Sequence, residues 1–165
     1  MDFLRMKAKA EKTEAVILAR LSGYEGVAVL FPFGGGNARY DLAIEYNSTF
    51  YRIQCKTGNL EQRGTTIGFS AASSTYHYYG GKVRERRDYR GQVEYFGVYC
   101  PQNDKAYLVP VDVVGRTKGM LRLVEAKNNQ EKNVHWAEDY EIEKVMEHSL
   151  SRFEDEEAHI EIISK

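Results

Sequence analysis

Residues 40–56 read YDLAIEYNSTFYRIQCK and predict two β-strands joined by a tight turn. Apolar, aromatic and β-branched residues dominate both halves of this stretch, which is typical of strands. The residues between them, Tyr46-Asn47-Ser48, are of the kind that reverse a chain into a hairpin. We therefore expect a strand over Tyr40–Glu45 to pair with a strand over Phe50–Lys56.

The second strand carries a pair of polar side chains that suit metal chemistry. Because side chains alternate between the faces of a strand, Gln54 and Lys56 project together. Asp41 lies near the end of the neighbouring strand, within reach of both. A carboxylate, an amide oxygen and the Cys55 carbonyl suit a hard divalent cation, and a lysine can orient or deprotonate an attacking water. The spacing predicts a metal-dependent site for phosphodiester hydrolysis, although such triplets also occur by chance.

A carboxylate lies on the apolar face of the first predicted helix. Glu14 is followed after three, four and seven positions by Ile17, Leu18 and Leu21. Because an unpaired buried carboxylate is unstable, Glu14 would need a cation, a metal ion or strong hydrogen-bond donors. We expect it to join the same site, with Glu11 as the substitute candidate. The alternative is that Glu14 only borders the apolar stripe and stays solvated.

The segment from Ser73 to Arg90 combines hydroxyl groups, tyrosine rings and positive charge. Its second half, Lys82–Arg90, holds five basic and two acidic residues, and the glycines at 80 and 81 favour a mobile loop that orders on contact. Such side chains contact phosphates and sugars and stack on bases. The candidates for DNA contact are Ser74, Tyr76, Arg84, Arg86, Arg87 and Arg90. The alternatives are a solvated charged surface and tyrosine stacking on unpaired RNA bases.

The rest of the chain alternates between helical and strand periods. A helix is expected from about residue 9 to 21, strands over 27–31, 65–71, 95–100 and 106–109, and a helix over 137–153. These elements predict an α/β domain with a mixed central β-sheet flanked by helices. We expect residues 1–140 to form this domain. Residues 141–165 would be its acidic C-terminal helical extension, whose apolar stripe would support self-association.

Composition and charge narrow the class of protein. The chain has 165 residues, 42% of them hydrophobic, which fits one globular domain. Residues 137–165 hold ten acidic and three basic residues, so the remaining chain carries a net charge of +6 although the total is −1. That distribution suits a phosphate-backbone partner. With no apolar run for a membrane span or signal peptide, we expect an intracellular protein, cytoplasmic or nucleoid-associated, with reduced Cys55 and Cys100.

Several segments together resemble a known family. They are Pro32-Phe33-Gly34, Arg39–Leu42, Arg52–Gly58, Tyr95–Pro101, Tyr107–Pro110 and Trp136–Tyr140. In this combination the chain resembles the PD-(D/E)XK endonucleases that include an intron-encoded homing enzyme. The resemblance implies a restriction-endonuclease-like core, Mg²⁺ as the cofactor with Mn²⁺ as a substitute, and action on duplex DNA by a homodimer or homotetramer. It places Asp41, Gln54 and Lys56 at the catalytic strand positions, and Glu14 at the acidic helix position.

Two positions depart from the family's pattern. Gln54 stands where the superfamily usually has a second acid, and Tyr40 stands where its name indicates proline. An amide oxygen can still bind a metal ion, and Glu14 can supply the missing negative charge. We expect Asp41 and the Cys55 carbonyl to bind the metal, with Gln54 and Glu14 as direct or water-mediated ligands. The open alternatives are a Holliday junction resolvase, which acts on four-way junctions, and a catalytically inactive DNA-binding module of the same fold.

Overall fold

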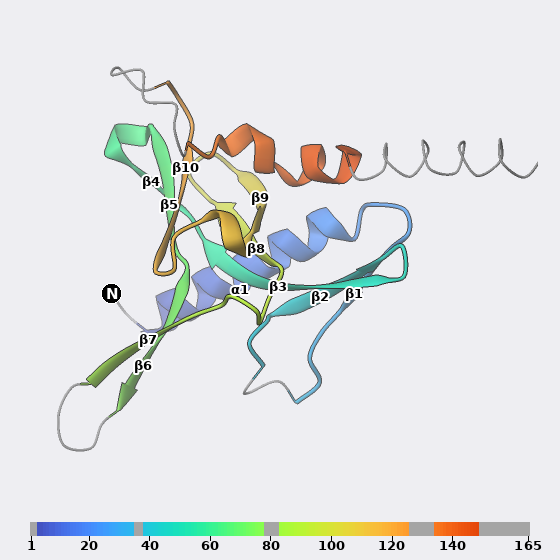
Figure 1. Ribbon diagram of the computed structural model, residues 1–165, viewed down its shortest axis with the longest axis horizontal. Coiled ribbons are helices and arrows are strands. Elements are labelled where there is room, and N and C mark those ends of the chain that lie inside the picture. The colour runs from blue at the N-terminus through green and yellow to red at the C-terminus, as the bar shows by residue number, and fades with distance from the viewer. Residues whose placement is uncertain (1–2, 35–37, 78–82, 126–133, 149–165) are drawn as a thin grey trace, which may run out of the picture.

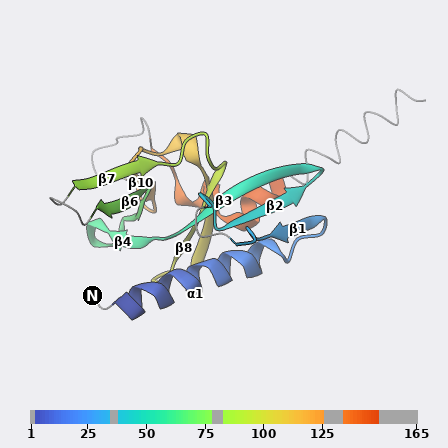
Figure 2. The same ribbon diagram turned by 90° about the horizontal axis from the view of Figure 1, so that it is seen from below.

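A computed structural model describes residues 3–34, 38–77, 83–125 and 134–148. The central sheet has the strand order β1-β2-β3-β8-β9, with β3 and β8 parallel and the other neighbours antiparallel. These strands are β1 (Val27–Leu30), β2 (Leu42–Tyr46), β3 (Thr49–Thr57), β8 (Tyr95–Cys100) and β9 (Lys105–Pro110). Helix α1 (Phe3–Leu21) runs along one face of this sheet (Figures 1 and 2). The predicted mixed α/β fold is therefore confirmed.

Two smaller sheets lie beside the central one. The first has the order β10-β5-β4, and the second is a two-stranded ribbon of β6 and β7 that projects from the body (Figure 1). The elements are β4 (Asn59–Glu61), β5 (Thr66–Ser70), β6 (Ala72–His77), β7 (Val83–Asp88), β10 (Lys118–Arg122) and the 3₁₀ turns η1 (Gln62–Gly64), η2 (Val111–Val113) and η3 (Ala137–Tyr140). A further helix covers residues 142–148.

The hairpin of β2 and β3 forms as the sequence predicts. Its turn places Asn47 and Ser48 at positive φ, 49° and 58°, a conformation that matches the right-handed twist of the paired strands. Leu42 pairs with Ile53, and this register continues to Tyr46 opposite Thr49. The pairing with β2 therefore ends before the last residues of β3, whose backbone groups extend past the start of β2.

Helix α1 packs through buried side chains that recur every four residues, Thr13, Ile17 and Leu21. Ile17 and Leu21 join β2 and β3 side chains in one hydrophobic cluster. Thr13, which is 1% exposed, shares a 2.7 Å hydrogen bond with the hydroxyl of Thr57. Glu14 is adjacent to this stripe and only half-buried. It therefore borders the apolar face, because the buried stripe runs through Thr13 one position earlier.

The sheet approaches α1 closely at Gly97 in β8. A Cβ at this position would lie 2.9 Å from Cγ2 of Ile17 and 3.0 Å from Cγ2 of Ile53. We predict that Gly97→Ala lowers the free energy of unfolding by about 1–3 kcal/mol, because overpacking forces neighbouring side chains to shift. Urea denaturation measures this loss. Gly23→Ala is the control, since a Cβ there would have its nearest contact at 3.6 Å, and equal losses in both variants would contradict the prediction.

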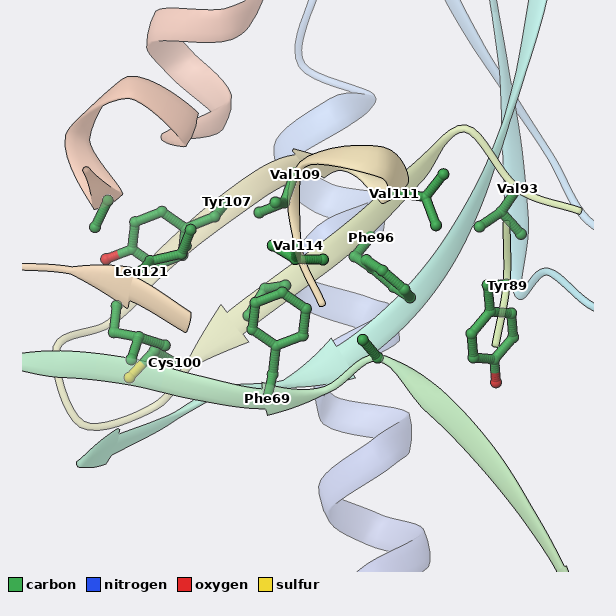
Figure 3. Packing of buried hydrophobic residues seen from close by; sticks show 14 residues of the cluster. Phe69, Tyr89, Val93, Phe96, Cys100, Tyr107, Val109, Val111, Val114 and Leu121 are labelled. Atoms are coloured by element: carbon green, nitrogen blue, oxygen red, sulfur yellow. The ribbon is translucent and has the colours of Figure 1, made fainter. Parts of the chain in front are cut away.

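A second hydrophobic cluster fills the space between the other face of the central sheet and the β10-β5-β4 sheet (Figure 3). Phe96 of β8 lies at its centre and makes edge-to-face contacts with Phe69 and Tyr89, at 5.6 and 5.7 Å between ring centroids. Such contacts bury the apolar surface of the rings and also restrict their orientation. Tyr89, which directly follows the β6–β7 ribbon, is thus fixed against the central sheet.

The largest difference from the sequence prediction is the β6–β7 ribbon. The expected mobile loop is instead two paired strands over Ala72–His77 and Val83–Asp88, and residues 78–82, with the two glycines, lie outside the described residues. The sequence of β7, VRERRD, has no apolar alternation that would have indicated a strand. Helix α1 also begins at Phe3, earlier than the expected residue 9.

The C-terminal helix begins at residue 142, later than the expected residue 137, and it packs within the chain. After η3, residues 142–148 are helical, and Ile142 and Met146 are buried in the hydrophobic cluster that includes Ile17 of α1. The apolar stripe expected to support self-association is therefore covered, as far as residue 148, by the chain's own core. Within the described ranges, no helix has the length and apolar character to cross a membrane. Cys55 and Cys100 are buried free thiols, as predicted.

Candidate active site

Asp41 is hydrogen-bonded to β3 at the point where the pairing of β3 with β2 ends. The Asp41 backbone N–H donates to the Ile53 carbonyl at 3.0 Å, and its Oδ2 accepts the backbone N–H of Cys55 at 2.7 Å. Oδ2 also accepts a hydrogen bond from Nε2 of Gln54. The N–H and C=O of a strand residue point to the same side, so the Cys55 carbonyl faces this carboxylate too, and it lies 3.4 Å from Nε2 of Gln54. The structure thus brings Asp41, Gln54 and Cys55 together.

Lys56 lies on the same side of the sheet as Asp41. It shares a face of β3 with Gln54, whose side-chain amide donates to Asp41. The Lys56 Nζ donates a hydrogen bond to the hydroxyl of Tyr89 at 3.2 Å and lies 4.7 Å from the Tyr89 ring centroid. Tyr89 is therefore a direct partner of the ammonium group.

Glu14 reaches the vicinity of Asp41 from α1. Its pKa is raised above the ordinary value by partial burial, by the charge of Asp41 and by the charge of Glu11, in that order. Among the described residues, Glu14 has no ion pair or hydrogen bond through its side chain. Glu11 is 62% exposed and pairs with Lys7 at 3.8 Å, so it is directed toward solvent. Of the two candidate acids, Glu14 is thus the one whose surroundings include Asp41.

The electrostatics around Asp41 and Glu14 suit a bound cation. Burial raises the pKa of Asp41, and this effect exceeds the opposing effects of the Cys55 N–H, the charge of Lys56 and the Gln54 hydrogen bond. Burial, followed by the charges of Asp41 and Glu14, also raises the pKa of the Cys55 thiol. Negative charge is therefore incompletely compensated around Asp41, and a bound divalent cation would offset it.

The donor atoms fit a hard metal ion. With Nε2 of Gln54 directed at Asp41, the available oxygens are Oδ1 of Asp41, Oε1 of Gln54, the Cys55 carbonyl and the Glu14 carboxylate. Across the described ranges, no group of three His, Cys, Asp or Glu side chains could hold a metal ion. A site here would thus combine two carboxylates with an amide and a backbone carbonyl. Such an oxygen set suits Mg²⁺ or Mn²⁺ and does not suit Zn²⁺.

Comparison with known proteins identifies the family of the chain. The family model of the PD-(D/E)XK endonucleases matches residues 4–143. The chain belongs to this endonuclease family. Among curated protein sequences, none is significantly similar to it. Its fold is similar to the solved structure of a bacterial homing endonuclease, I-Ssp6803I, with a TM-score of 0.64, 20% sequence identity, and coverage of 92% of this chain and 97% of that one.

Most of the residues predicted to contact DNA lie on the β6–β7 ribbon. Ser74 pairs with Arg86 and Tyr76 with Arg84, so these four alternate positions share one face of the β6–β7 ribbon. The side chains of Ser74, Arg86 and Arg87 are exposed, while those of Tyr76 and Arg84 lie outside the described part of the structure. Arg90 is separate from this group, because its guanidinium donates to the Val114 carbonyl at 2.8 Å and pairs with Asp112 at 3.7 Å.

Two residues of this candidate site were not predicted from the sequence. Tyr89 contacts Lys56, and the guanidinium carbon of Arg39 lies 4.2 Å from the centroid of the same Tyr89 ring. Arg39 precedes Asp41 by two residues, which could have suggested a place near the site. Tyr89 gave no such signal, because its contact with Lys56 depends on how the chain returns after the β6–β7 ribbon.

Proposed function

We propose that the protein is a metal-dependent endonuclease that hydrolyses DNA phosphodiester bonds, of the homing or restriction type. The observation that carries this proposal is the convergence of Asp41, Gln54 and Lys56 at one end of the β2–β3 hairpin, with Glu14 nearby. Family membership and the shared fold with a homing endonuclease support it. We infer that the enzyme acts on DNA inside the cell.

Each residue has a role that its position supports. Asp41 and the Cys55 carbonyl would bind Mg²⁺, with Mn²⁺ as a substitute, and Gln54 and Glu14 would bind it directly or through water. The bound metal would supply Lewis acidity and charge compensation at the scissile phosphate. Lys56 would orient the attacking water and stabilise the negative charge that develops on the phosphate.

Residues of the β6–β7 ribbon would bind the substrate. Ser74, Arg86 and Arg87, together with Tyr76 and Arg84, would contact the DNA backbone, and Arg90 would support the segment that follows the ribbon. The described part of each chain provides one candidate site, so we expect the cutting of both strands of a duplex to involve two copies. We therefore propose a homodimer or homotetramer as the active species, which agrees with the closed symmetry of most oligomers.

We predict that purified protein cleaves DNA with Mg²⁺ or Mn²⁺ and that EDTA stops cleavage completely. The test incubates the protein with plasmid, linear duplex, single-stranded DNA and a synthetic four-way junction, with and without metal. Cleavage of a particular duplex sequence supports a homing or restriction enzyme. Symmetric nicking of the junction alone would instead identify a resolvase.

The second candidate function is a DNA-binding module that does not cleave DNA. Gln54 favours it, because a neutral side chain stands where the superfamily usually has an acid. Such a module would bind DNA with a steep salt dependence. It would show no cleavage of any substrate with Mg²⁺ or Mn²⁺. This outcome would overturn the proposed enzymatic activity while leaving the fold and DNA binding intact.

A further inference from the structure

Tyr89 connects the candidate lysine to the hydrophobic core. Its side chain is 4% exposed, and its ring packs against Phe96 almost perpendicularly, at 89°. The hydroxyl points out of the cluster, away from Phe96 and Val93 (Figure 3), and accepts the hydrogen bond from Nζ of Lys56 at 3.2 Å. A buried ring with one polar atom directed at a lysine can limit the positions of that flexible side chain.

Arg39 links the Tyr89 ring to the base of the β6–β7 ribbon, where Ser73 and Asp88 lie. Its Nη1 donates to Oγ of Ser73 at 2.8 Å, its Nη2 donates to the Asp88 carbonyl at 2.9 Å, and its Nε donates to Oε1 of Gln92. The same guanidinium packs on the Tyr89 ring at 4.2 Å. Ser73 belongs to β6 and Asp88 ends β7, so one side chain links both strands of the ribbon to Tyr89.

The two cations share one aromatic ring. The Tyr89 centroid lies 4.2 Å from the Arg39 guanidinium carbon and 4.7 Å from Nζ of Lys56, within the range of attraction between a cation and a ring face. Without the ring and its hydroxyl, both cations would lose an attractive partner. Tyr89, which is held by its packing against Phe96, thus contacts the Lys56 ammonium and the Arg39 guanidinium at the same time.

On the basis of the nuclease function proposed above, we propose that Tyr89 is a positioning residue for Lys56 and that Arg39 couples this position to the base of the β6–β7 ribbon. The planar guanidinium is needed for the second role, because it donates in three directions while packing on a ring. DNA bound on the ribbon would then help to hold the lysine at the scissile phosphate.

Tyr89→Phe tests the first role because it removes the hydroxyl and keeps the ring. We predict that kcat for DNA cleavage falls about tenfold, the order expected for losing a hydrogen bond to a charged group. The Kd for DNA in EDTA should be unchanged, as should the temperature of unfolding. Tyr51→Phe is the matched control, since Tyr51 packs on Tyr95 in the cluster with α1. Equal kcat in wild type and Tyr89→Phe overturns the role.

A second measurement needs neither metal nor DNA. The ammonium N–H signal of Lys56 in an NMR spectrum is visible when a hydrogen bond slows exchange with water. We expect this signal in the wild type and in Tyr51→Phe, and its loss in Tyr89→Phe. A signal that persists in Tyr89→Phe would show that another group holds Lys56, which contradicts the proposal.

Arg39→Lys tests the coupling, with Arg20→Lys as its control because Arg20 pairs with Glu143 away from the ribbon. We predict a loss of kcat for Arg39→Lys in the wild-type background and little further loss in the Tyr89→Phe background, since residues acting through one partner are not additive. Additive losses overturn the coupling. Arg39→Gln is measured in the same way if Arg39→Lys fails to fold.

The two proposals fail in different ways. If the wild type cleaves no DNA with any divalent metal, the nuclease function fails, while the Lys56 signal still reports whether Tyr89 holds the lysine. If the wild type cleaves DNA and Tyr89→Phe cleaves it equally well, the positioning role fails and the nuclease function stands.

Discussion

Asp41→Ala is expected to abolish Mg²⁺-dependent DNA cleavage while DNA binding persists. Asp41 provides the carboxylate that contacts β3 directly, through the Cys55 N–H and the Gln54 amide. Its removal takes away an anionic metal ligand and also releases Gln54, which would lose its partner. Because a negative charge is removed near the phosphate, we expect the Kd for DNA in EDTA to stay the same or decrease.

Two variants separate charge from structure at this position. Asp41→Asn keeps the side-chain shape and an oxygen that can accept the Cys55 N–H, but it lacks the negative charge that offsets the charge of a divalent cation. We expect it to be as inactive as Asp41→Ala while unfolding at a temperature nearer to the wild type. Asp139→Ala is the control, since Asp139 is exposed and pairs with Lys144. Cleavage by Asp41→Ala at the wild-type rate would remove the proposed mechanism.

The hairpin that carries the site could be predicted because its information is local. Strand alternation placed Gln54 and Lys56 on one face, and the polar turn set the register that brings Asp41 beside them. Helical spacing in the first helix indicated Glu14, and the family pattern placed an acid at the same position. Its position was less well predicted, because helical spacing was read from the apolar residues alone. The buried stripe in fact includes Thr13, whose hydroxyl is satisfied by Thr57.

The contacts around Lys56 could not be predicted because they join distant parts of the chain. Tyr89 is 33 residues from Lys56, and it reaches the site only because β6 and β7 pair and return the chain to the central sheet. The charged residues of β7 do not form the apolar alternation of a strand, so this pairing could not be predicted from the sequence. Basic residues in such a segment are typical of an exposed loop, whereas here the backbone pairs and the side chains of Arg86 and Arg87 remain exposed.

Lys56→Met is expected to lower kcat by about 100-fold to 1000-fold, the loss found when a group that stabilises transition-state charge is removed. Methionine keeps most of the length of the apolar stem, so packing beside Tyr89 is largely retained. The Kd for DNA in EDTA should rise only slightly, since one positive charge is lost. Lys118→Met is the control, because Lys118 pairs with Glu61 at 2.6 Å on the small sheet.

Lys56→Arg decides whether charge alone is sufficient. An ammonium can donate to the Tyr89 hydroxyl at 3.2 Å while lying 4.7 Å from its ring centroid. A guanidinium is larger and planar, so it would not reproduce the position of the ammonium against the Tyr89 hydroxyl and ring. We therefore expect Lys56→Arg to retain DNA binding and still lose most cleavage. Cleavage at the wild-type rate would mean that the site needs only a positive charge at this position, and the role assigned to the lysine's placement would be wrong.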